Sequence, residues 1–501
     1  MSRVLETEIL IIGAGSTGLC IARELSRYQV DVTVVDKNAD VCLGQVKASW
    51  GSVYSAIGLT SADSLFLKSA MTPELRISKL FERDTLKTRL TVEGFRLFSG
   101  MAEDLDIPFR LGKRILLGSN DDDFKALEIV EEVCRSMDIN PEHLDQEAIQ
   151  DLEPHVSNDI KFGLAMDNDV GFIYSWEFGF ALVENAQYNG ARILLQTEVL
   201  GIKSMNGWFL VETNQGKIRT RFIVNAAGLY ADKIAQMAGV CDFGFNFFCN
   251  MALVTDRRVG YLLNHNVSFV SYPGRPRGLA PTRSGNILIG CSGFHPVHHL
   301  VNASSPTRRE WIEESMVHCK TLIPAIREQD IITSYSGVYQ INTRDPEDHL
   351  IEVSKGNRQF INAVVRMPSL AMTPAISKYV VNLLGNQGLD LKEKAEFNPR
   401  RKGIPKPGEL SDQERSQLIA QDSRYGHIVC RCEGVSEGEI VEAIRRGART
   451  VSGVKYRTRA GMGRCQMNTC GPKIVEILSR ELDMPEEEII YKGAGSRVLG
   501  S

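Results

Sequence analysis

The sequence predicts an α/β fold in which a Rossmann-like β-α-β unit opens the chain and a small helical module closes it. The apolar run Glu8-Ile9-Leu10-Ile11-Ile12 is typical of a buried parallel strand and leads into the glycine turn Gly13-Ala14-Gly15-Ser16-Thr17-Gly18. Helical character at 19–28 and a second strand at 32–36 complete the unit. Near the other end, four cysteines follow a segment rich in proline, glycine and charge, which indicates a separate domain.

Length and composition limit the possible functions. At 501 residues the chain exceeds one compact core, so we expect two or three domains. A composition of 43% hydrophobic and 24% charged residues fits a globular protein, and a net charge of −4 gives no reason to expect nucleic acid as a partner. No apolar run approaches the roughly 18–20 residues that span a bilayer, and the first six residues lack a signal-peptide core. We therefore expect a cytoplasmic protein without a membrane span of its own.

The glycine turn fits a dinucleotide site because each glycine has a task in such a site. Gly13 makes the tight turn, Gly15 lets a pyrophosphate approach the backbone, and Gly18 allows the helix to pack closely on the strand. The phosphates would lie at the positive end of the following helix. Asp36 ends the second strand, eighteen residues after Gly18, and is placed to accept hydrogen bonds from ribose hydroxyls.

The middle of the chain contains both helix-like and strand-like patterns of apolar residues. We expect helix-like, charge-rich structure from 61 to about 152, including a helix at 123–137, and a strand-like and turn-like stretch at 162–175. Further expected elements are a helix at 177–188, a strand at 222–228 that ends in a glycine turn, strand-like alternation at 243–340 with turns at 273–274 and 284–286, and a closing helix at 374–384.

The segment Asn225-Ala226-Ala227-Gly228-Leu229-Tyr230-Ala231-Asp232 resembles the second flavin-contact motif of the D-amino-acid-oxidase-like FAD-dependent oxidoreductases. Other matching segments occur in the same order along the chain: Leu152-Glu153-Pro154, Leu182-Val183-Glu184-Asn185-Ala186, Thr197-Glu198-Val199, Pro281-Thr282 and Thr373-Pro374-Ala375-Ile376. The resemblance covers roughly residues 5–395. It implies bound FAD rather than a dissociable nicotinamide nucleotide, and a substrate domain whose antiparallel sheet, with helices, covers the flavin ring. The residues assigned to FAD are Gly13, Gly15, Ser16, Thr17, Gly18, Asp36, Lys37, Val199, Ala227 and Gly228.

The four C-terminal cysteines are spaced as metal ligands. Cys430 and Cys432 form a C-x-C pair, and after thirty-two intervening residues Cys465 and Cys470 form a C-x4-C pair. Four thiolates bind zinc or an iron–sulfur cluster, but C-x-C is awkward for zinc because adjacent ligands must splay apart. The other seven cysteines have no ligand spacing, and in a reducing compartment we interpret them as small buried hydrophobic residues.

Helix signals surround these cysteines. Ser436 and Glu439 form a capping box that predicts a helix at 440–446, and Pro472 predicts a helix at 473–482 whose positive end lies near Cys470. Five basic residues are expected to surround the ligands and to offset the negative charge of a cluster: Arg431, Lys455, Arg457, Arg459 and Arg464.

The tracts 430–434 and 461–472 resemble the BFD-like [2Fe-2S] module, and in particular the version fused to the large subunit of anaerobic glycerol-3-phosphate dehydrogenases. The resemblance favours a [2Fe-2S] cluster over zinc or an unmetallated site. It also implies partner subunits, through which any membrane contact would come. We therefore divide the chain into an FAD-dependent oxidoreductase at 1–395, with dinucleotide-binding parts at about 1–80, 150–240 and 335–395, a linker at 396–425 and the [2Fe-2S] module at 426–490.

Three segments depart from the oxidoreductase pattern. Tyr54 stands where the glycerol-phosphate and 2-hydroxyglutarate branches generally carry a histidine that faces the flavin. Tyr339, within Gly337-Val338-Tyr339-Gln340, stands where the family often has an arginine that clamps an anionic substrate group. Met367-Pro368-Ser369-Leu370 replaces a Ser-Pro-Gly-Leu segment. These departures predict a substrate other than glycerol 3-phosphate.

The candidate catalytic residues follow from these departures. Tyr54, Tyr339 and His295 are candidates for the base, and Arg366 is a candidate to bind a substrate carboxylate, although a structural ion pair is its other interpretation. Arg283 is a second cationic candidate. The cluster of His295, His298 and His299 is interpreted as a solvated loop rather than a metal site.

Together these features predict an FAD-dependent dehydrogenase that oxidises a small hydroxy or amino compound: a hydroxy acid, an amino or imino acid, or a polyol phosphate. Electrons would pass from the flavin to the [2Fe-2S] cluster and then to a partner subunit or acceptor. Two alternatives stay open. One is an oxidase that uses oxygen directly and has a structural cluster, and the other is an electron-transfer or assembly subunit that turns over no substrate of its own.

Overall fold

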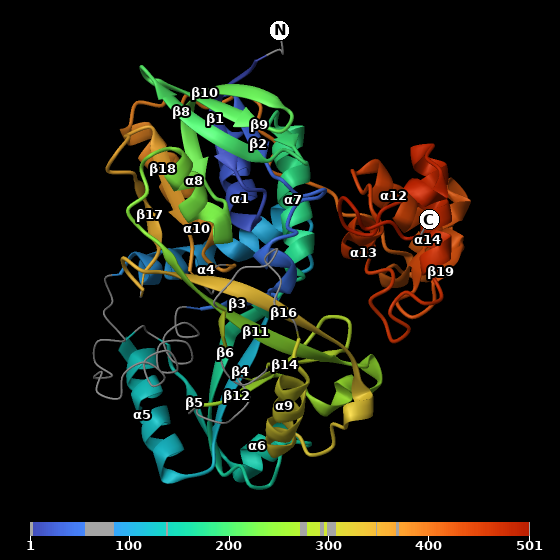
Figure 1. The fold of residues 1–501 in the computed structure, drawn as a ribbon. Helices are drawn as coiled ribbons and strands as arrows, with labels where there is room; N and C mark the ends of the chain where they lie inside the picture. Colours follow the sequence, from blue (N-terminus) through green and yellow to red (C-terminus); the bar gives the residue numbers. More distant parts are fainter. Residues whose placement is uncertain are drawn as a thin grey trace.

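The computed structural model describes residues 4–55, 85–136, 139–270, 278–290, 295–297, 307–346, 348–366 and 370–499. Two sheets form the body of the molecule, and a compact helical unit made by the C-terminal residues lies at its side (Figure 1). Within the described residues no helix has the length and apolar character needed to cross a bilayer.

The first sheet confirms the predicted Rossmann-like unit. Its five neighbouring strands β18, β10, β1, β2 and β7 are parallel, and β17 pairs antiparallel with β18 at one edge. An antiparallel meander of β8 and β9 extends from the start of β10. The strands are β1 (Leu5–Ile12), β2 (Val32–Val35), β7 (Arg192–Leu194), β8 (Val199–Met205), β9 (Trp208–Thr213), β10 (Gly216–Asn225), β17 (Leu350–Val353) and β18 (Phe360–Val364).

Helices cover both faces of this sheet. One face carries α1, which packs against α7 and α10, while α4 packs on α10 (Figure 1). The other face carries α8 and the meander, each face with its own apolar core. The helices are α1 (Ser16–Leu25), α4 (Leu86–Asp104), α7 (Ser175–Tyr188), α8 (Ala231–Met237) and α10 (Thr373–Asn386). The predicted helices at 19–28, 177–188 and 374–384 are thereby confirmed.

The second sheet has the strand order β15-β11-β14-β13-β12-β4-β6-β3, with β16 added on β11 and β5 on β6. All its pairs are antiparallel except β12 with β4. The strands are β3 (Ser52–Tyr54), β4 (Arg110–Gly118), β5 (Glu142–Asp145), β6 (Phe162–Phe172), β11 (Phe245–Thr255), β12 (Asn266–Phe269), β13 (Leu279–Pro281), β14 (Ile287–Gly290), β15 (His295–Val297) and β16 (Ile331–Asn342). The helices of this part are α5 (Asp121–Ser136), α6 (Gln146–Leu152) and α9 (Arg309–Leu322).

Two expectations about this part were wrong. Strand β4 lies inside the stretch expected to be helix-like, because its run of buried apolar residues pairs with β6 and β12 in the middle of the sheet. Helix α9 lies inside the stretch expected to alternate as strands, because Ser315, Met316, Cys319 and Leu322 have helical spacing and pack into the core of this sheet. The turn at 284–286 is confirmed, and the turn predicted at 273–274 lies outside the described residues.

The C-terminal unit has a core of its own, which includes Ile440, Ile444, Val454, Ile474 and Leu478. The predicted capping box is present, with Ser436 and Glu439 bonded to each other's backbone N–H, and a proline lies in the first turn of α14 as expected. Helix α11 (Asp412–Gln421) precedes the unit, whose own elements are β19 (Ile428–Cys430), β20 (Val435–Ser436), α12 (Glu437–Arg445), α13 (Val451–Thr458) and α14 (Gly471–Leu482).

The segment before this unit lies along helix α7 of the first sheet's helical layer. The Arg401 guanidinium pairs with Glu184 at 2.7 Å, and the Lys406 ammonium pairs with Glu177 at 2.8 Å. The segment also contains helix α11, which the sequence did not predict because its apolar content is low; a capping box of Ser411 and Glu414 begins it. The segment therefore wraps the body of the molecule before the chain enters the C-terminal unit.

Candidate active site and cysteine cluster

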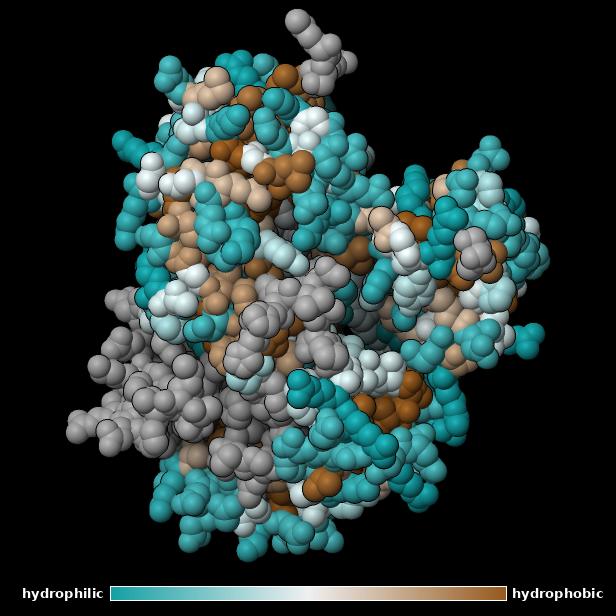
Figure 2. All heavy atoms as spheres, viewed as in Figure 1, coloured by the Kyte–Doolittle hydropathy of each residue, from teal (hydrophilic) through white to brown (hydrophobic). Residues whose placement is uncertain are grey.

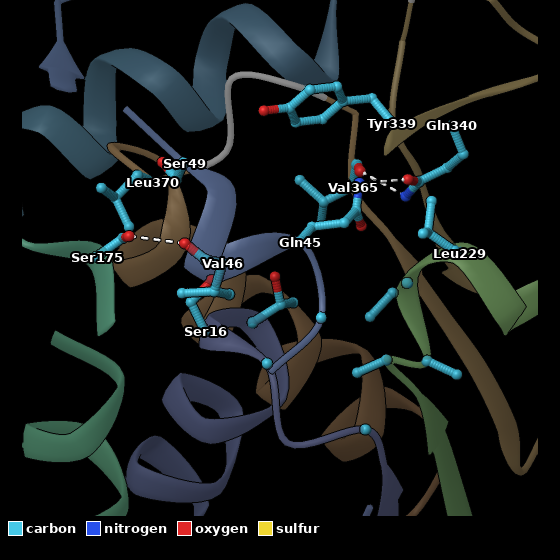
Figure 3. A pocket seen from close by; sticks show the side chains of 18 of the residues that line it. Ser16, Gln45, Val46, Ser49, Ser175, Leu229, Tyr339, Gln340, Val365 and Leu370 are labelled. Carbon is cyan, nitrogen blue, oxygen red and sulfur yellow. Dashed lines mark hydrogen bonds between the residues drawn. The ribbon is translucent and has the colours of Figure 1, made fainter. Parts of the chain in front are cut away.

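A cavity of about 530 Å³ lies where the carboxyl ends of β1, β2 and β10 approach the second sheet. Side chains from both sheets line it, and the glycine turn, the 3-10 helix Gln45–Ala48 and strand β16 meet around it (Figure 3). The crevice outside the carboxyl ends of parallel strands is where doubly wound folds bind their ligands.

The glycine turn leaves room for a ligand at one position only. A Cβ on Gly13, which has a φ of +113°, would lie 2.3 Å from the Ala226 carbonyl oxygen, and one on Gly18 would lie 2.1 Å from the Gly13 carbonyl oxygen. A Cβ built on Gly15 would lie 3.9 Å from its nearest atom, so the backbone at Gly15 is open to the cavity. The geometry fits the task predicted for each glycine.

The start of helix α1 is prepared for an anion. The helix begins at Ser16, its N-cap Gly15 offers no side-chain hydrogen bond, and its first turn holds no acidic residue. The backbone N–H groups there have no partner inside the helix, which favours phosphate. Asp36 accepts a hydrogen bond from the Ala14 N–H at 2.8 Å and from the Asn38 N–H at 2.9 Å, with its carboxylate on the cavity wall.

The remaining residues assigned to FAD lie around the same cavity. The Lys37 ammonium lies 3.6 Å from the ring centroid of Tyr230, and Gly228 adopts a φ of +56° at the cavity wall. Every assigned residue lines the cavity except Gly18, which packs the helix against the turn. The described residues therefore fit the adenine–ribose–pyrophosphate part of FAD.

Hydrogen bonds fix the wall between the two sheets. The Gln45 amide donates to the Gln340 side chain at 2.8 Å, and the Gln340 amide donates to the Val365 carbonyl at 3.1 Å (Figure 3). On the opposite side the Ser175 hydroxyl donates to the Val46 carbonyl at 2.7 Å. None of these side chains was predicted as a site residue, because glutamine and serine at these positions carry no recognisable spacing.

Tyr54 and Tyr339 both line the cavity, and Arg366 is not among its lining residues. The Tyr339 side chain is buried and its hydroxyl donates to the Ala48 carbonyl at 3.3 Å, while Tyr54 lies on β3. Arg366 is buried away from the lining residues, and its backbone N–H donates to Nδ1 of His349 at 3.0 Å. Arg283 pairs with Glu409 at 3.1 Å, which gives it a structural partner.

The other candidates fall partly outside the described residues. His295 lies on β15, where its backbone pairs with Cys249 of β11, but its side chain is outside the part that the structure describes. His298, His299 and the segment 367–369 are also outside it. The roles predicted for His295 and for Met367-Pro368-Ser369 therefore stay predictions.

A buried arginine that was not predicted from the sequence also lines the cavity. Arg114 of β4 is 3% exposed, and its Nε atom lies 2.7 Å from the carboxylate of Asp169, which is equally buried. Its guanidinium lies 5.9 Å from the ring centroid of Tyr54. The signal in the sequence was a charged residue directly before the apolar run Ile115-Leu116-Leu117, since a buried charge needs a partner or a function.

The four C-terminal cysteines converge at one end of their unit. Cys430 and Cys470 are buried and Cys432 and Cys465 are partly exposed. The Gly461 N–H lies 3.5 Å from the sulfur of Cys430. A hydrogen bond from the backbone of Thr469 lowers the pKa of Cys465, whereas burial raises the pKa of Cys470 to about 12.

Cys432 interacts with Cys465 and Cys430, and Cys470 interacts with Cys430 and Cys465, so the four thiols lie close together. Four thiolates are the ligand set of a [2Fe-2S] cluster, in which two irons share them. The cysteine cluster therefore fits a [2Fe-2S] centre.

The expected collar of five basic residues was wrong in part. Arg457 extends away from the cysteines and donates to Asp40, in the loop after β2, at 2.9 Å. Arg459 pairs with Glu433 at 2.9 Å, so its charge is already compensated. Lys455 is buried close enough to Cys470 for the thiolate charge to act on its pKa, although burial has the larger effect and lowers it.

Aromatic residues connect the cavity with the C-terminal unit. Ser175 lines the cavity, and its neighbours Tyr174 and Trp176 stack with ring centroids 5.2 Å apart. Trp176 packs on Tyr456 of α13 at 5.5 Å, and the Arg459 guanidinium lies 4.5 Å from the ring centroid of Tyr174. The cysteine unit thus rests on residues adjacent to the cavity wall.

Comparisons with known proteins agree with both sites. A family model described as FAD dependent oxidoreductase matches residues 8–383, and one described as BFD-like [2Fe-2S] binding domain matches residues 428–480. The chain is similar to a glycerol 3-phosphate dehydrogenase of Caloramator mitchellensis, at 35% identity over 98% of each chain. It is also similar to one of the subunits of the anaerobic glycerol-3-phosphate dehydrogenase of Escherichia coli K12, at 23% identity over 95% of this chain and 88% of that protein. In fold it resembles the L-alpha-glycerophosphate oxidase of Mycoplasma pneumoniae with FAD bound, with a TM-score of 0.69 and 24% identity over 79% of this chain and 98% of the other.

Proposed function

Because the chain belongs to the FAD-dependent oxidoreductase family and carries a BFD-like [2Fe-2S] binding domain, we propose that it is a dehydrogenase of a small hydroxy compound. The observation that carries this proposal is the cavity, which joins the glycine turn of the first sheet to a polar wall on the second sheet. Glycerol 3-phosphate is the first compound to test, although Tyr54 and Tyr339 predict a different substrate, because a relative similar over 98% of each chain is a glycerol 3-phosphate dehydrogenase.

FAD would be held by the residues that surround the cavity. Backbone N–H groups at Ser16 and Thr17 would bind the pyrophosphate, the space in front of Gly15 admits it, and the Asp36 carboxylate would accept ribose hydroxyls. When bound, FAD supplies the acceptor for the electrons of the substrate C–H bond. The chain's own residues then have to orient the substrate and take the proton from its hydroxyl group.

Tyr54 and Tyr339 are the residues proposed to accept the proton of the substrate hydroxyl group, because both line the cavity where the second sheet faces the glycine turn. The Tyr339 hydroxyl donates to the Ala48 carbonyl, which fixes the position of its oxygen at the cavity wall. His295 stays a further candidate base, whereas the anion-binding role predicted for Arg366 has no support from the cavity, which Arg366 does not line. Hydrophobic side chains such as Leu116, Leu229 and Leu370 line the remaining wall and exclude water.

The cysteine unit would receive the electrons and deliver them to a partner. Its contacts with Tyr174 and Trp176, which flank a cavity-lining serine, hold the unit beside the cavity wall and support electron transfer between the two sites. A relative is named as one of the subunits of an anaerobic dehydrogenase, which supports further subunits for this chain. In the view of Figure 2 the C-terminal unit is largely hydrophilic with scattered apolar residues, which favours a partner held by polar contacts.

An anaerobic flavin-reduction experiment tests the proposal. The pure protein should show flavin and iron–sulfur absorption bands, and one small hydroxy compound should bleach the flavin without oxygen. Glycerol 3-phosphate, glycerate, 2-hydroxyglutarate and L-proline should be tested in parallel, the last as an amino compound. Reoxidation of the reduced flavin by oxygen as fast as turnover would indicate an oxidase, and bleaching by none of the compounds would indicate a subunit without its own turnover.

A further inference from the structure

Four polar residues of the second sheet line the cavity, two of them on the adjacent strands β4 and β12 and two on the more distant strands β11 and β3. We name this set, Arg114 of β4, Asn250 of β11, Asn266 of β12 and Ser52 of β3, the polar wall. Arg114 and Asn266 are register partners on adjacent strands, so their side chains lie side by side. All four residues are at most 7% exposed. The polar wall is therefore a set of buried polar residues at the cavity.

Three atoms of the polar wall lack hydrogen-bond partners. The Ser52 hydroxyl, the Asn250 amide oxygen and the Asn266 amide nitrogen have no partner within the part of the chain that the structure describes. Buried polar groups are bonded in most proteins, because an unmade bond costs the desolvation of the group. Three such atoms belong to residues that line one cavity, which indicates that a polar ligand bound there completes them.

Arg114 is held in place from behind. Its Nε atom lies 2.7 Å from Asp169, whose carboxylate also accepts from the Ser55 hydroxyl. One terminal nitrogen faces the sulfur of Met166 at 3.6 Å, which is a weak acceptor. A guanidinium has five N–H donors in a planar fork, so donors remain for a group in the cavity. An oxyanion matches this fork better than any neutral group does.

We propose that Arg114 binds an oxyanion of the substrate, a carboxylate or a phosphate, and that Asn250, Asn266 and Ser52 bind its hydroxyl groups. The unpartnered oxygen of Asn250 needs a donor and the unpartnered nitrogen of Asn266 needs an acceptor. A hydroxyl group supplies both, whereas a fully ionised phosphate or carboxylate supplies only acceptors. The substrate class is thus a small hydroxy acid or hydroxy phosphate, an inference that rests on the proposed dehydrogenase function.

Thermal unfolding separates a binding role from a structural one. Replacing Asn250 or Asn266 by leucine removes polar atoms that have no partner among the described residues, so N250L and N266L should keep or raise the Tm of the holoprotein. Asn286 is the matched control, since it is equally buried but donates to the Thr255 carbonyl at 2.8 Å and does not line the cavity. N286L should lower the Tm. Loss of Tm in N250L and N266L as large as in N286L would overturn the proposal.

Anaerobic flavin reduction tests the ligand class directly. For the compound that bleaches the wild-type flavin, N250L and N266L should raise the half-saturating concentration about tenfold. R114K keeps the charge beside Asp169 but loses the forked guanidinium. The half-saturating concentration of glycerol 3-phosphate or glycerate should therefore rise at least about tenfold, while that of glycerol should stay the same. The phosphate and carboxylate compounds show which oxyanion the site takes.

The outcomes distinguish this inference from the proposed function. If hydroxy compounds bleach the wild-type flavin but the variants keep wild-type half-saturation, the polar wall does not bind substrate and the dehydrogenase function stands. An equal loss for glycerol and for the anionic compounds in R114K would remove the oxyanion assignment. If no compound bleaches the flavin, the dehydrogenase function fails, and the Tm comparison with N286L still decides whether the polar wall is a ligand site.

Discussion

Asp40, in the loop after β2, and Arg457, in helix α13 of the cysteine unit, form a buried ion pair although 417 residues separate them. The guanidinium nitrogen Nη2 donates to the Asp40 carboxylate at 2.9 Å, and the two side chains are 3% and 5% exposed. The same guanidinium lies 3.8 Å from the ring centroid of Phe180 in α7. The pair therefore joins the cysteine unit to the dinucleotide-binding sheet.

Replacement of Arg457 by methionine should destabilise this junction. The change leaves the Asp40 carboxylate buried without a partner, which costs roughly 3–5 kcal/mol. The double variant with Asp40→Leu should recover much of the loss, as measured by thermal unfolding and by protease sensitivity of the segment 396–425. Arg309→Met is the matched control, because that arginine pairs with Glu313 on the exposed surface and such pairs contribute at most about 1 kcal/mol. A single variant as stable as the control would show that the junction does not depend on the pair.

Substitution of one ligand cysteine should separate the two cofactors. Cys430→Ser or Cys470→Ser is expected to abolish the iron–sulfur absorption and the bound iron while the flavin absorption remains, because the cysteines lie in a unit with its own core. Cys241→Ser is the control, since that thiol donates to the Phe243 carbonyl at 3.1 Å and serine can do the same. Bound zinc in place of iron in the wild-type protein, determined by elemental analysis, would contradict the cluster assignment.

Gly15→Ala should weaken FAD binding without harming the fold. The added methyl group would have 3.9 Å to its nearest protein atom, so the chain tolerates it, but it would fill the space proposed for the pyrophosphate. The expected result is a folded protein that loses flavin on dilution, measured as the Kd for FAD. Gly100→Ala, in helix α4 with no atom within 4 Å, should keep FAD and gain about 0.5–1 kcal/mol of stability. Unchanged FAD affinity in Gly15→Ala would remove the pyrophosphate assignment.

His349 should make the protein sensitive to acid. Burial, with smaller effects from the charges of Lys87 and Arg366, lowers the pKa of His349 to about 3. Since the unfolded chain binds a proton near pH 6.5, the stabilisation is complete above that pH and falls as the pH decreases toward 3. The loss between pH 7 and pH 4 is about 3 kcal/mol.

The variant His349→Asn keeps an acceptor for the Arg366 N–H but does not titrate, so its Tm should fall less than the wild-type Tm over this pH range. His143→Asn serves as the surface comparison, because that side chain is 61% exposed and pairs with Glu131 rather than with the buried core. Parallel pH curves for wild type and His349→Asn would mean that other groups determine the acid sensitivity.

Local signals made much of the fold predictable. The glycine turn between β1 and α1, the capping box at Ser436 and the proline of α14 depend on neighbours a few residues away, so the sequence contains them completely. The polar wall could not be predicted in the same way. Arg114 and Asn266 lie side by side only because β4 pairs with β12, and Asn250 lines the same cavity from another strand of that sheet. The periodicity of a sequence does not determine the order or the register of its strands.

The wrong expectation for Arg457 has a similar cause. Its closeness to the cysteines in the sequence suggested that it compensates a cluster, but helix α13 turns that side chain toward Asp40 and Phe180. Neighbouring positions of a helix point in different directions, so closeness along the chain does not show which partner a charge meets. Arg459, two positions on, instead meets Glu433 beside Cys432.

Helix α7 carries contacts of three kinds along fourteen residues: Ser175 at the cavity, Phe180 under the Arg457 guanidinium, and Glu177 and Glu184 bonded to the segment that precedes the cysteine unit. Because both the cysteine unit and the segment before it contact helix α7, the unit of a relative cannot simply replace this one. A chimera that takes this unit from a relative needs the α7 surface of that relative as well. Turnover should also not depend on solvent viscosity, as it does in proteins whose redox domain moves between partners.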